Sequence, residues 1–341
     1  MHVLITGHKG FIGTVLVPMA QAAGHTVLGL DADLYRNSTY GTEPKPIPEL
    51  IKDVRDIEKD DIRGIDGIIH LAALSNDVLG DLSPDLTYQI NQAASVRLAA
   101  MAKELGIQRF VFASSCSLYG AAGDDMLDES APFNPITAYA KSKVGVEQEV
   151  ATLADDHFSP TFMRNATAYG ISPRMRFDVV INNLTAWAYT TGKVHMKSDG
   201  TPWRPVVHIE DIARAALAAL TAPRDIIHNQ AFNVGSTSHN YRIHELAEFV
   251  KATVPQCEIS FAEDAGPDTR CYRVNFDKYE KAFPDARLEW DALRGIQDIH
   301  QSYKTIGLGR DEYEGPKYKR IAQLKQLLST GQLDATLRWV G

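Results

Sequence analysis

The stretch TGHKGFIG, residues 6–13, decides the fold. It sets Gly7, Gly10 and Gly13 between an apolar run typical of a buried strand and an amphipathic run typical of a helix. In such a turn the first glycine permits the tight bend, the second lets the backbone approach a pyrophosphate, and the third lets the helix pack closely on the strand. Because the N-terminus of the helix faces the phosphate charge, this stretch predicts a dinucleotide-binding turn.

Apolar runs and helical patterns alternate through the first third of the chain. Continuous apolar strands that alternate with helices indicate parallel β-α-β units, with helices on both faces of a sheet. The expected strands are 2–7, 25–31, 67–73 and 109–115, and the expected helices are 11–24 and 89–106.

From about residue 166 the alternation loosens and Pro, Gly and polar residues become frequent. Further helices are expected at 209–221, at 243–253 and around 318–330. We therefore expect an α/β protein with a doubly wound parallel sheet and a smaller, discontinuous C-terminal lobe that closes over the carboxyl ends of the strands. The expected division is a cofactor-binding domain in 1–165, with returning segments near 205–235, and a substrate-binding lobe mainly in 166–341.

Bulk composition excludes several classes of function. A net charge of −8 over 341 residues argues against binding of nucleic acid or an anionic membrane as the main task. The 3 cysteines are widely spaced and the 11 histidines form no H-E-x-x-H pattern, so no metal site is expected. The first apolar run is too short for a signal peptide or a membrane span, and we expect a cytoplasmic protein.

Asp31 ends the second expected strand, in the run LGLD. A carboxylate at this place can accept hydrogen bonds from both hydroxyls of the adenosine ribose, and it would repel a 2′-phosphate. NAD is therefore favoured over NADP as the cofactor. Arg36 follows closely in the sequence and weakens that preference, because a guanidinium can bind a 2′-phosphate.

A phenol and an ammonium stand one helical turn apart in the stretch TAYAKSKVGVEQE, residues 137–149. Tyr139 and Lys143 are at positions i and i+4, which lie on the same face of a helix. A surface cation–π contact is the more common explanation for such a pair taken alone. The alternative is a catalytic phenol with a labile proton.

Several separated motifs favour the catalytic explanation. The chain resembles an extended short-chain dehydrogenase/reductase of the NAD-dependent nucleotide-sugar epimerase/dehydratase type, with a Rossmann-type fold. The resemblance spans most of the chain and is carried, in order, by TGHKGFIG, KDVRD, HLAA, SSCSLYG, YAKSK and RPVVHIED.

The resemblance implies a set of site residues. Asp53 and Val54 are expected beside the adenine, and Asn91 behind the active site. The implied catalytic residues are Ser115, Tyr139 and Lys143, and the last two also contact the cofactor. The other implied cofactor-binding residues are Gly7, Gly10, Phe11, Ile12, Gly13, Asp31, Asp53, Val54, Leu71, Ala72, Ala73 and Asn91. The implied substrate-binding residues are Ser115, Thr167, Asn183, Arg204 and Arg270.

In this family a tyrosine removes the proton of a sugar hydroxyl while the carbon gives hydride to NAD. A free phenol has a pKa of about 10, so we expect the charges of Lys143 and the nicotinamide ring to lower it. A shift of roughly 3 units corresponds to about 4 kcal/mol, which two close charges can supply in a poorly solvated site. Ser115 is expected to orient the substrate oxygen.

Two departures from the family pattern bear on the reaction. Dehydratases of the family carry an Asp-Glu pair directly after the catalytic hydroxyl, where this chain has Cys116 and Ser117. A 4,6-dehydratase is therefore not expected, and Cys116 is interpreted as a packed thiol. A family asparagine that contacts substrate is replaced by Thr167, with Asn165 nearby but out of register.

These features predict an NAD-dependent nucleotide-sugar epimerase, which oxidises C4 to a keto sugar and reduces it on the other face. The alternative is a net oxidoreductase, either a 4-keto-sugar reductase or a sugar-nucleotide dehydrogenase, since both use the same triad. A dinucleotide-binding regulator without turnover is disfavoured by the intact triad. By analogy, a homodimer is expected through the helices in 89–106 and 139–154.

Overall fold

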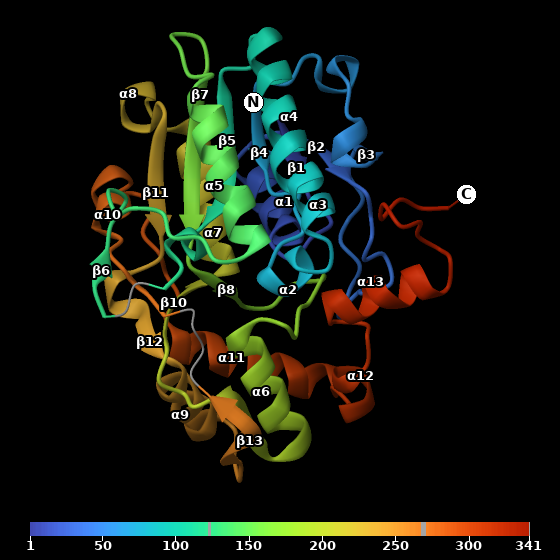
Figure 1. Ribbon diagram of the computed structural model, residues 1–341, viewed down its shortest axis with the longest axis vertical. Coiled ribbons are helices and arrows are strands. Elements are labelled where there is room, and N and C mark those ends of the chain that lie inside the picture. The colour runs from blue at the N-terminus through green and yellow to red at the C-terminus, as the bar shows by residue number, and fades with distance from the viewer. Residues whose placement is uncertain (122–123, 267–270, 341) are drawn as a thin grey trace.

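The structure is a computed structural model that describes residues 1–121, 124–266 and 271–340. Its centre is a parallel sheet of seven strands in the order β11-β7-β5-β4-β1-β2-β3 (Figure 1). The strands are β1 (His2–Thr6), β2 (Thr26–Asp31), β3 (Glu49–Ile51), β4 (Gly67–His70), β5 (Arg109–Ser115), β7 (Ser159–Asn165) and β11 (Gln230–Val234).

The strand order reverses between β1 and β4. From β1 the chain adds β2 and β3 toward one edge, and then returns to add β4, β5, β7 and β11 toward the other. In a doubly wound sheet such a switch point opens a crevice at the carboxyl ends of the strands, and ligands bind there. The glycine stretch directly follows β1, so it lies at this crevice.

Both faces of the sheet are covered by helices, which explains the continuous apolar strands. Along β1, Val3 and Ile5 pack into one core with α1 and α7, whereas Leu4 packs into a second core with α4 and α5. The helices of the first face are α1 (Gly13–Ala22) and α7 (Ile209–Thr221). Those of the second face are α2 (Asp77–Gly80), α3 (Pro84–Thr87), the π-helix η3 (Tyr88–Ala93), α4 (Ala94–Glu104) and α5 (Ala138–Ala151).

A smaller lobe with its own apolar core lies below the sheet in Figure 1. Leu184, Leu246 and Ile296 contribute to this core from three different helices. The elements of the lobe are α6 (Val180–Thr191), β9 (Lys193–Ser198), α9 (Ile243–Thr253), β13 (Glu258–Gly266), α11 (Ala292–Ile306) and α12 (Arg310–Glu314).

Short elements connect the sheet to the lobe. A three-stranded sheet is formed by β8 (Thr167–Tyr169), β10 (Trp203–His208) and β12 (Asn240–Arg242), and a two-stranded one by β6 (Met126–Leu127) and β14 (Arg273–Val274). The remaining helices are η1 (Val54–Asp56), η2 (Lys59–Ile62), η4 (Cys116–Tyr119), α8 (Arg224–Ile227), η5 (Thr237–His239), α10 (Asp277–Ala282) and α13 (Arg320–Ser329). After α13 the chain turns back toward β2 and β3 (Figure 1).

The α/β doubly wound fold predicted from the sequence is confirmed. The expected helices 209–221 and 243–253 have the bounds of α7 and α9. The helix expected at 89–106 differs, because its first turns are the π-helix η3 and regular α-helix begins only at Ala94. None of the helices in the described ranges combines the length and apolar character of a membrane span.

Candidate active site

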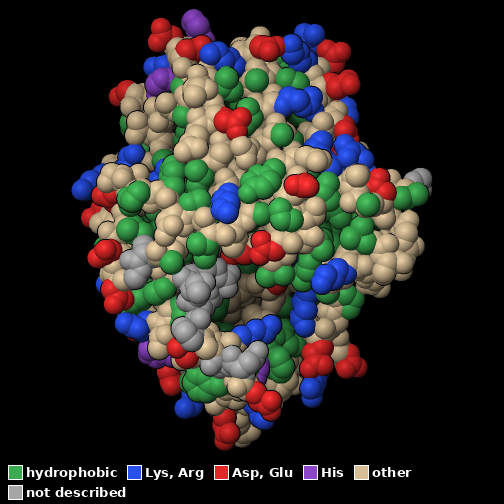
Figure 2. Space-filling model, in the orientation of Figure 1, with side chains coloured by type: hydrophobic (Ala, Val, Ile, Leu, Met, Phe, Trp, Pro, Cys, Tyr) green, Lys and Arg blue, Asp and Glu red, His purple; other side chains and the backbone are tan. Residues whose placement is uncertain are grey.

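A cleft of about 1030 Å³ lies between the carboxyl ends of the strands and the smaller lobe. Figure 2 shows it as a hollow in the lower half of the molecule, with Lys and Arg side chains along its rim. Its walls come from the turn after β1, the ends of β2, β4 and β5, the start of α5, and the lobe. The cleft is therefore built by segments far apart in the sequence.

The turn after β1 forms a cradle that only glycine allows. Gly7 has a φ of 72°, and a Cβ there would lie 2.8 Å from the backbone nitrogen of Ala72. A Cβ on Gly13 would lie 2.2 Å from the carbonyl oxygen of Gly7. Helix α1 starts directly behind the cradle, and because Ile12 and Gly13 at its start line the cleft, the positive end of the helix dipole faces this wall. Gly10, Phe11 and Ile12 line the same wall, and these residues fit a dinucleotide pyrophosphate.

Asp31 lies at the end of β2 and lines the cleft beside this turn. Its carboxylate accepts hydrogen bonds from the backbone N–H of Asp33 at 2.8 Å and of Lys9 at 3.0 Å. Burial nevertheless raises the pKa of Asp31 above its usual range. The held carboxylate fits the expected acceptor for ribose hydroxyls. Arg36 is not among the residues that line the cleft, and its guanidinium carbon lies 3.4 Å from the ring centroid of Trp339.

Further expected cofactor residues line the same part of the cleft. Asp53 caps η1 and forms a bidentate ion pair with Arg55, with N···O distances of 2.9 and 2.7 Å. Val54 follows it in the wall, and the backbone of Leu71, Ala72 and Ala73 forms the floor after β4. The nitrogens of Leu71 and Ala72 are each 3.2 Å from Thr6 Oγ1, which fixes this floor to β1.

Asn91 lies behind the cleft wall rather than in it. Its amide accepts from the N–H of Leu74 at 2.8 Å and donates to the carbonyl of Leu74 at 3.1 Å and to Ser142 Oγ at 3.2 Å. Asn91 therefore joins the loop after β4 to helix α5, and it positions other residues without lining the cleft itself.

Ser115, Tyr139 and Lys143 meet at the centre of the cleft. Ser115 is the last residue of β5, and Tyr139 and Lys143 lie in the first turns of α5. Lys143 Nζ donates to the carbonyl of Ala113 at 2.7 Å and lies 5.7 Å from the ring centroid of Tyr139. The helix starts where it does because Thr137 caps it, accepting from the N–H of Ala140 at 3.1 Å. The surface-contact explanation for the Tyr–Lys pair is thereby excluded.

The charges at this centre differ from the sequence expectation. Burial raises the pKa of Tyr139 to about 12, although a hydrogen bond with Ser115 and the charge of Arg176 both lower it. Burial also lowers the pKa of Lys143 to about 7, so its ammonium is not a fixed charge at neutral pH. Burial therefore dominates the pKa of Tyr139 in the protein without cofactor. The lowering expected from Lys143 together with the nicotinamide ring stays a prediction for the NAD-bound protein.

A buried ion pair holds the catalytic helix against the sheet. Glu147 of α5 accepts from Arg164 of β7, with Nη2 at 2.7 Å and Nε at 3.1 Å, and it also accepts from Ser114 Oγ. Arg164 Nη1 donates to Tyr119 at 3.0 Å, and Tyr119 donates to Asn233 at 2.8 Å. This network fixes the spacing between Ser115 on β5 and Tyr139 on α5.

Thr167, Asn183 and Arg204, which were expected to bind substrate, all line the cleft. Asn183 donates to the carbonyl of Phe177 at 2.7 Å and to the hydroxyl of Tyr313 at 3.1 Å. Arg204 donates to the carbonyl of Trp203 at 2.9 Å. Arg270 lies outside the described residues.

Two sets of residues that line the cleft were not predicted from the sequence. Arg176 and Asp178, in the run RMRFD, form an ion pair with a 2.8 Å N···O distance in the wall near Tyr139. The only feature of the sequence that could have indicated Arg176 and Asp178 is the opposite charge of two residues separated by one position. Arg320 and Leu337, from the C-terminal end, also line the cleft and carry no motif.

Cys116 is packed, as interpreted from the sequence. It is fully buried, its thiol lies 3.1 Å from the carbonyl of Arg164, and burial raises its pKa far above the usual range. Ser117 lines the cleft beside Ser115. Within the described ranges, no group of three or more His, Cys, Asp or Glu side chains has a geometry that could hold a metal ion.

Several known proteins are similar to this chain over most of its length. The sequence model of the NAD-dependent epimerase/dehydratase family matches residues 3–235. A UDP-glucose 4-epimerase of Bacillus subtilis is 24% identical over 328 residues, covering 88% of this chain and 94% of that protein. A UDP-glucose 4-epimerase of Mycolicibacterium smegmatis is 30% identical over 253 residues, covering 69% and 77%.

Among solved structures, that of TunA, an NAD-dependent NDP-hexosamine 5,6-dehydratase involved in tunicamycin biosynthesis, matches with a TM-score of 0.79. The two chains are 24% identical, and the match covers 89% of this chain and 98% of the other. At that identity the likeness shows a shared fold.

Proposed function

The chain belongs to the NAD-dependent epimerase/dehydratase family, and on that premise we propose that it is a nucleotide-sugar 4-epimerase. Membership makes it an NAD-dependent enzyme of the extended short-chain dehydrogenase/reductase type. The proposed substrate is a sugar linked to a nucleoside diphosphate, and the proposed reaction inverts C4 through a keto sugar.

One observation carries the proposal: a hydroxyl, a phenol and an ammonium converge in the same cleft as a glycine cradle for a dinucleotide. Two further observations favour an epimerase over a dehydratase. The acid and base that would expel a second hydroxyl are replaced by the buried thiol of Cys116 and by Ser117. Several curated relatives, two of them described above, are UDP-glucose 4-epimerases.

In the proposed mechanism Tyr139 exchanges the proton of the C4 hydroxyl. NAD, which Gly7, Gly10, Gly13 and Asp31 would hold, would supply a hydride acceptor and donor for the sugar carbon. With a pKa of about 12, Tyr139 is almost fully protonated at neutral pH in the protein alone, and a positive nicotinamide ring would favour the phenolate. Ser115 would donate to the sugar oxygen, and protonated Lys143 would hold the nicotinamide ribose.

We propose that the substrate diphosphate binds on the lobe side of the cleft. Arg204 supplies the cation there and Asn183 an amide, and both line this wall. Thr167 takes the family asparagine position, while Asn165 also lines the cleft with a buried Oδ1 that has no hydrogen-bond partner among the described residues. We assign the sugar contact at this point to Thr167 together with Asn165.

The proposed assembly is a homodimer through η3, α4 and α5. Light scattering of the purified protein tests this part separately, with about twice the chain mass of 37.6 kDa as the expected result. If the protein is a monomer, the proposed homodimer is wrong, and the catalytic proposal is unaffected.

The enzyme activity is tested with a panel of nucleotide sugars and no added cofactor. We expect one sugar and its C4 epimer to interconvert, with UDP-glucose as the first candidate. Turnover that consumes added NAD or NADH stoichiometrically would replace the epimerase with a keto-sugar reductase or a dehydrogenase. A product that has lost water would establish a dehydratase instead.

A further inference from the structure

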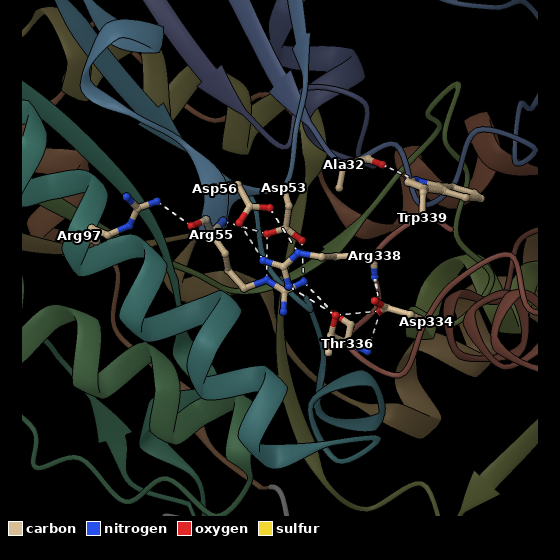
Figure 3. A network of polar contacts seen from close by, with 9 residues as sticks. All are labelled: Ala32, Asp53, Arg55, Asp56, Arg97, Asp334, Thr336, Arg338 and Trp339. Atoms are coloured by element: carbon tan, nitrogen blue, oxygen red, sulfur yellow. Dashed lines mark hydrogen bonds and ion pairs between the residues drawn. The ribbon is translucent and has the colours of Figure 1, made fainter. Parts of the chain in front are cut away.

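The C-terminal residues 332–340, here called the C-terminal strap, lie across the expected adenosine end of the cleft. Figure 3 shows Arg338, Trp339 and Thr336 of the strap beside Ala32, Asp53 and Asp56 of the Rossmann domain. Leu337 lines the cleft. Its side chain is buried in the same apolar core as Val54, which is expected beside the adenine.

Three polar contacts hold the strap in place. Arg338 forms a bidentate ion pair with Asp56, with N···O distances of 2.8 and 3.3 Å (Figure 3). Trp339 Nε1 donates to the carbonyl of Ala32 at 2.7 Å, directly after Asp31. Arg55, which pairs with Asp53, also donates to the carbonyl of Thr336 at 2.8 Å. Each contact ends on a segment that the cofactor is expected to touch.

The strap is an ordered turn with its own hydrogen bonds. Asp334 Oδ1 accepts from the N–H groups of Thr336 at 2.8 Å and of Arg338 at 3.0 Å, and Leu333 and Trp339 form an antiparallel bridge. Leu337 at the tip of the turn has a φ of 61°. A leucine rarely adopts this left-handed conformation, which costs of order 1–3 kcal/mol. This backbone strain coincides with a position at which the leucine forms part of the wall of the cleft.

We propose that the C-terminal strap is part of the cofactor site: it forms the outer wall of the adenosine subsite and retains NAD between turnovers. The ligand is the adenosine moiety of the dinucleotide, and Leu337 is its apolar contact. The Arg338–Asp56 ion pair, here called the fastening, holds the strap to η1. The role in turnover rests on the proposed epimerase, which must keep its NAD. The role in binding is independent of it.

The fastening is tested by charge reversal in the full-length protein. In Arg338→Glu, repulsion from Asp56 should open the strap, so less NAD co-purifies and NAD is released about fivefold faster. Asp56→Arg should do the same. The double variant Arg338→Glu/Asp56→Arg restores the pair with reversed polarity, and its NAD content and release rate should return toward those of the parent protein.

The wall is tested by Leu337→Gly, which removes the side chain while suiting the positive φ. NAD release should become about tenfold faster, as expected when an apolar contact worth one decade of affinity is lost. Leu293→Ala, at an exposed leucine of α11 that lies outside the strap and does not line the cleft, is the control and should release NAD at the parent rate.

Release is measured without substrate, from the holoenzyme mixed with excess competing nucleotide. These results therefore stand whether or not the chain proves to be an epimerase. Unchanged NAD content and release in both Arg338→Glu and Leu337→Gly would overturn the proposal. So would a double variant no better than the single ones, because the effect would then be general loosening. Melting temperatures identify any variant that fails to fold. The NAD release rates of the variants that do fold then decide whether the strap retains NAD.

Discussion

Two arginine–carboxylate pairs hold segments that build the cleft, one at the catalytic helix and one at the C-terminal strap, and they differ in exposure. Arg164 and Glu147 are each 5% exposed and join the catalytic helix to the sheet. Arg338 and Asp56 are 37% and 47% exposed and join the C-terminal strap to η1. The geometry of the two pairs is similar, since in each the guanidinium donates through both Nε and Nη2.

The difference in exposure separates two tasks. Breaking a buried pair leaves a charge in a poorly solvated interior, so the catalytic end is fixed as long as the protein is folded. An exposed pair is worth at most about 1 kcal/mol, so breaking it should loosen the adenosine end without unfolding the domain. The molecule thus combines a rigid reaction centre with a releasable cofactor wall.

The largest expected effect is on chemistry at the rigid end. Tyr139→Phe removes the group that exchanges the hydroxyl proton, so turnover should fall by about 10²–10⁴-fold, the typical contribution of general acid–base catalysis. Steady-state kinetics and NAD content are measured together. NAD content should stay at the parent level because the strap is untouched. Full activity in this variant would show that the assigned base is wrong.

The next effect is on stability. Arg164→Met leaves Glu147 buried without its partner and should lower the free energy of unfolding by about 3–5 kcal/mol. Urea unfolding measures this, and Arg164→Met/Glu147→Leu, which removes both charges, should recover much of the loss. A decrease below about 1 kcal/mol in the single variant would contradict the contrast drawn between the two pairs.

A third effect depends on pH and on Lys143. The unfolded chain keeps the lysine proton up to about pH 10.5, whereas the folded protein releases it at about pH 7. Between these values the unfolded state binds more protons, so the free energy of unfolding rises with pH, by at most about 1.4 kcal/mol per pH unit. Above pH 10 the raised pKa of Tyr139 acts in the opposite direction, because the folded protein holds a proton that the unfolded chain loses.

Urea unfolding of the cofactor-free protein between pH 7 and pH 10 therefore measures the protonation of Lys143. In Lys143→Met the free energy of unfolding should rise less steeply with pH, by a slope that corresponds to at most one bound proton. An identical pH dependence in the two proteins would mean that Lys143 stays charged in the fold.

The smallest effect is expected at the exposed pair. Asp56→Asn should lower the free energy of unfolding by no more than about 1 kcal/mol. The same variant should release NAD measurably faster. At the strap, the effect on NAD release would then be separated from the effect on protein stability. A stability loss as large as that of Arg164→Met would show that the strap is part of the structural core.

The sequence predicted the parts of the molecule that depend on local pattern. The apolar runs of β1 and β5 and the helices α7 and α9 follow directly from periodicity. The cradle of Gly7 and Gly13 could be predicted because its chemistry requires glycine at that spacing. Tyr139 and Lys143 were found because a helix brings i and i+4 together.

Properties set by long-range packing were not predictable. Arg338 contacts Asp56 across 282 positions in the sequence, and no local pattern marks that pair. The burial that raises the pKa of Tyr139 in the protein without cofactor was not predictable, because it depends on the whole cleft, while only the neighbouring lysine was visible in the sequence. The π-helix at η3 was missed because helical periodicity alone does not distinguish it from α-helix.

The central claim is that a single hydride leaves C4 and returns to the same carbon within one protein molecule. It is tested most directly with a nucleotide sugar that carries deuterium at C4, incubated with the holoenzyme and with excess unlabelled NAD in solution. The account predicts that the epimer forms with deuterium retained at C4 and none in the dissolved cofactor. Deuterium in the added NAD, or product that forms only as that NAD is consumed, would contradict it.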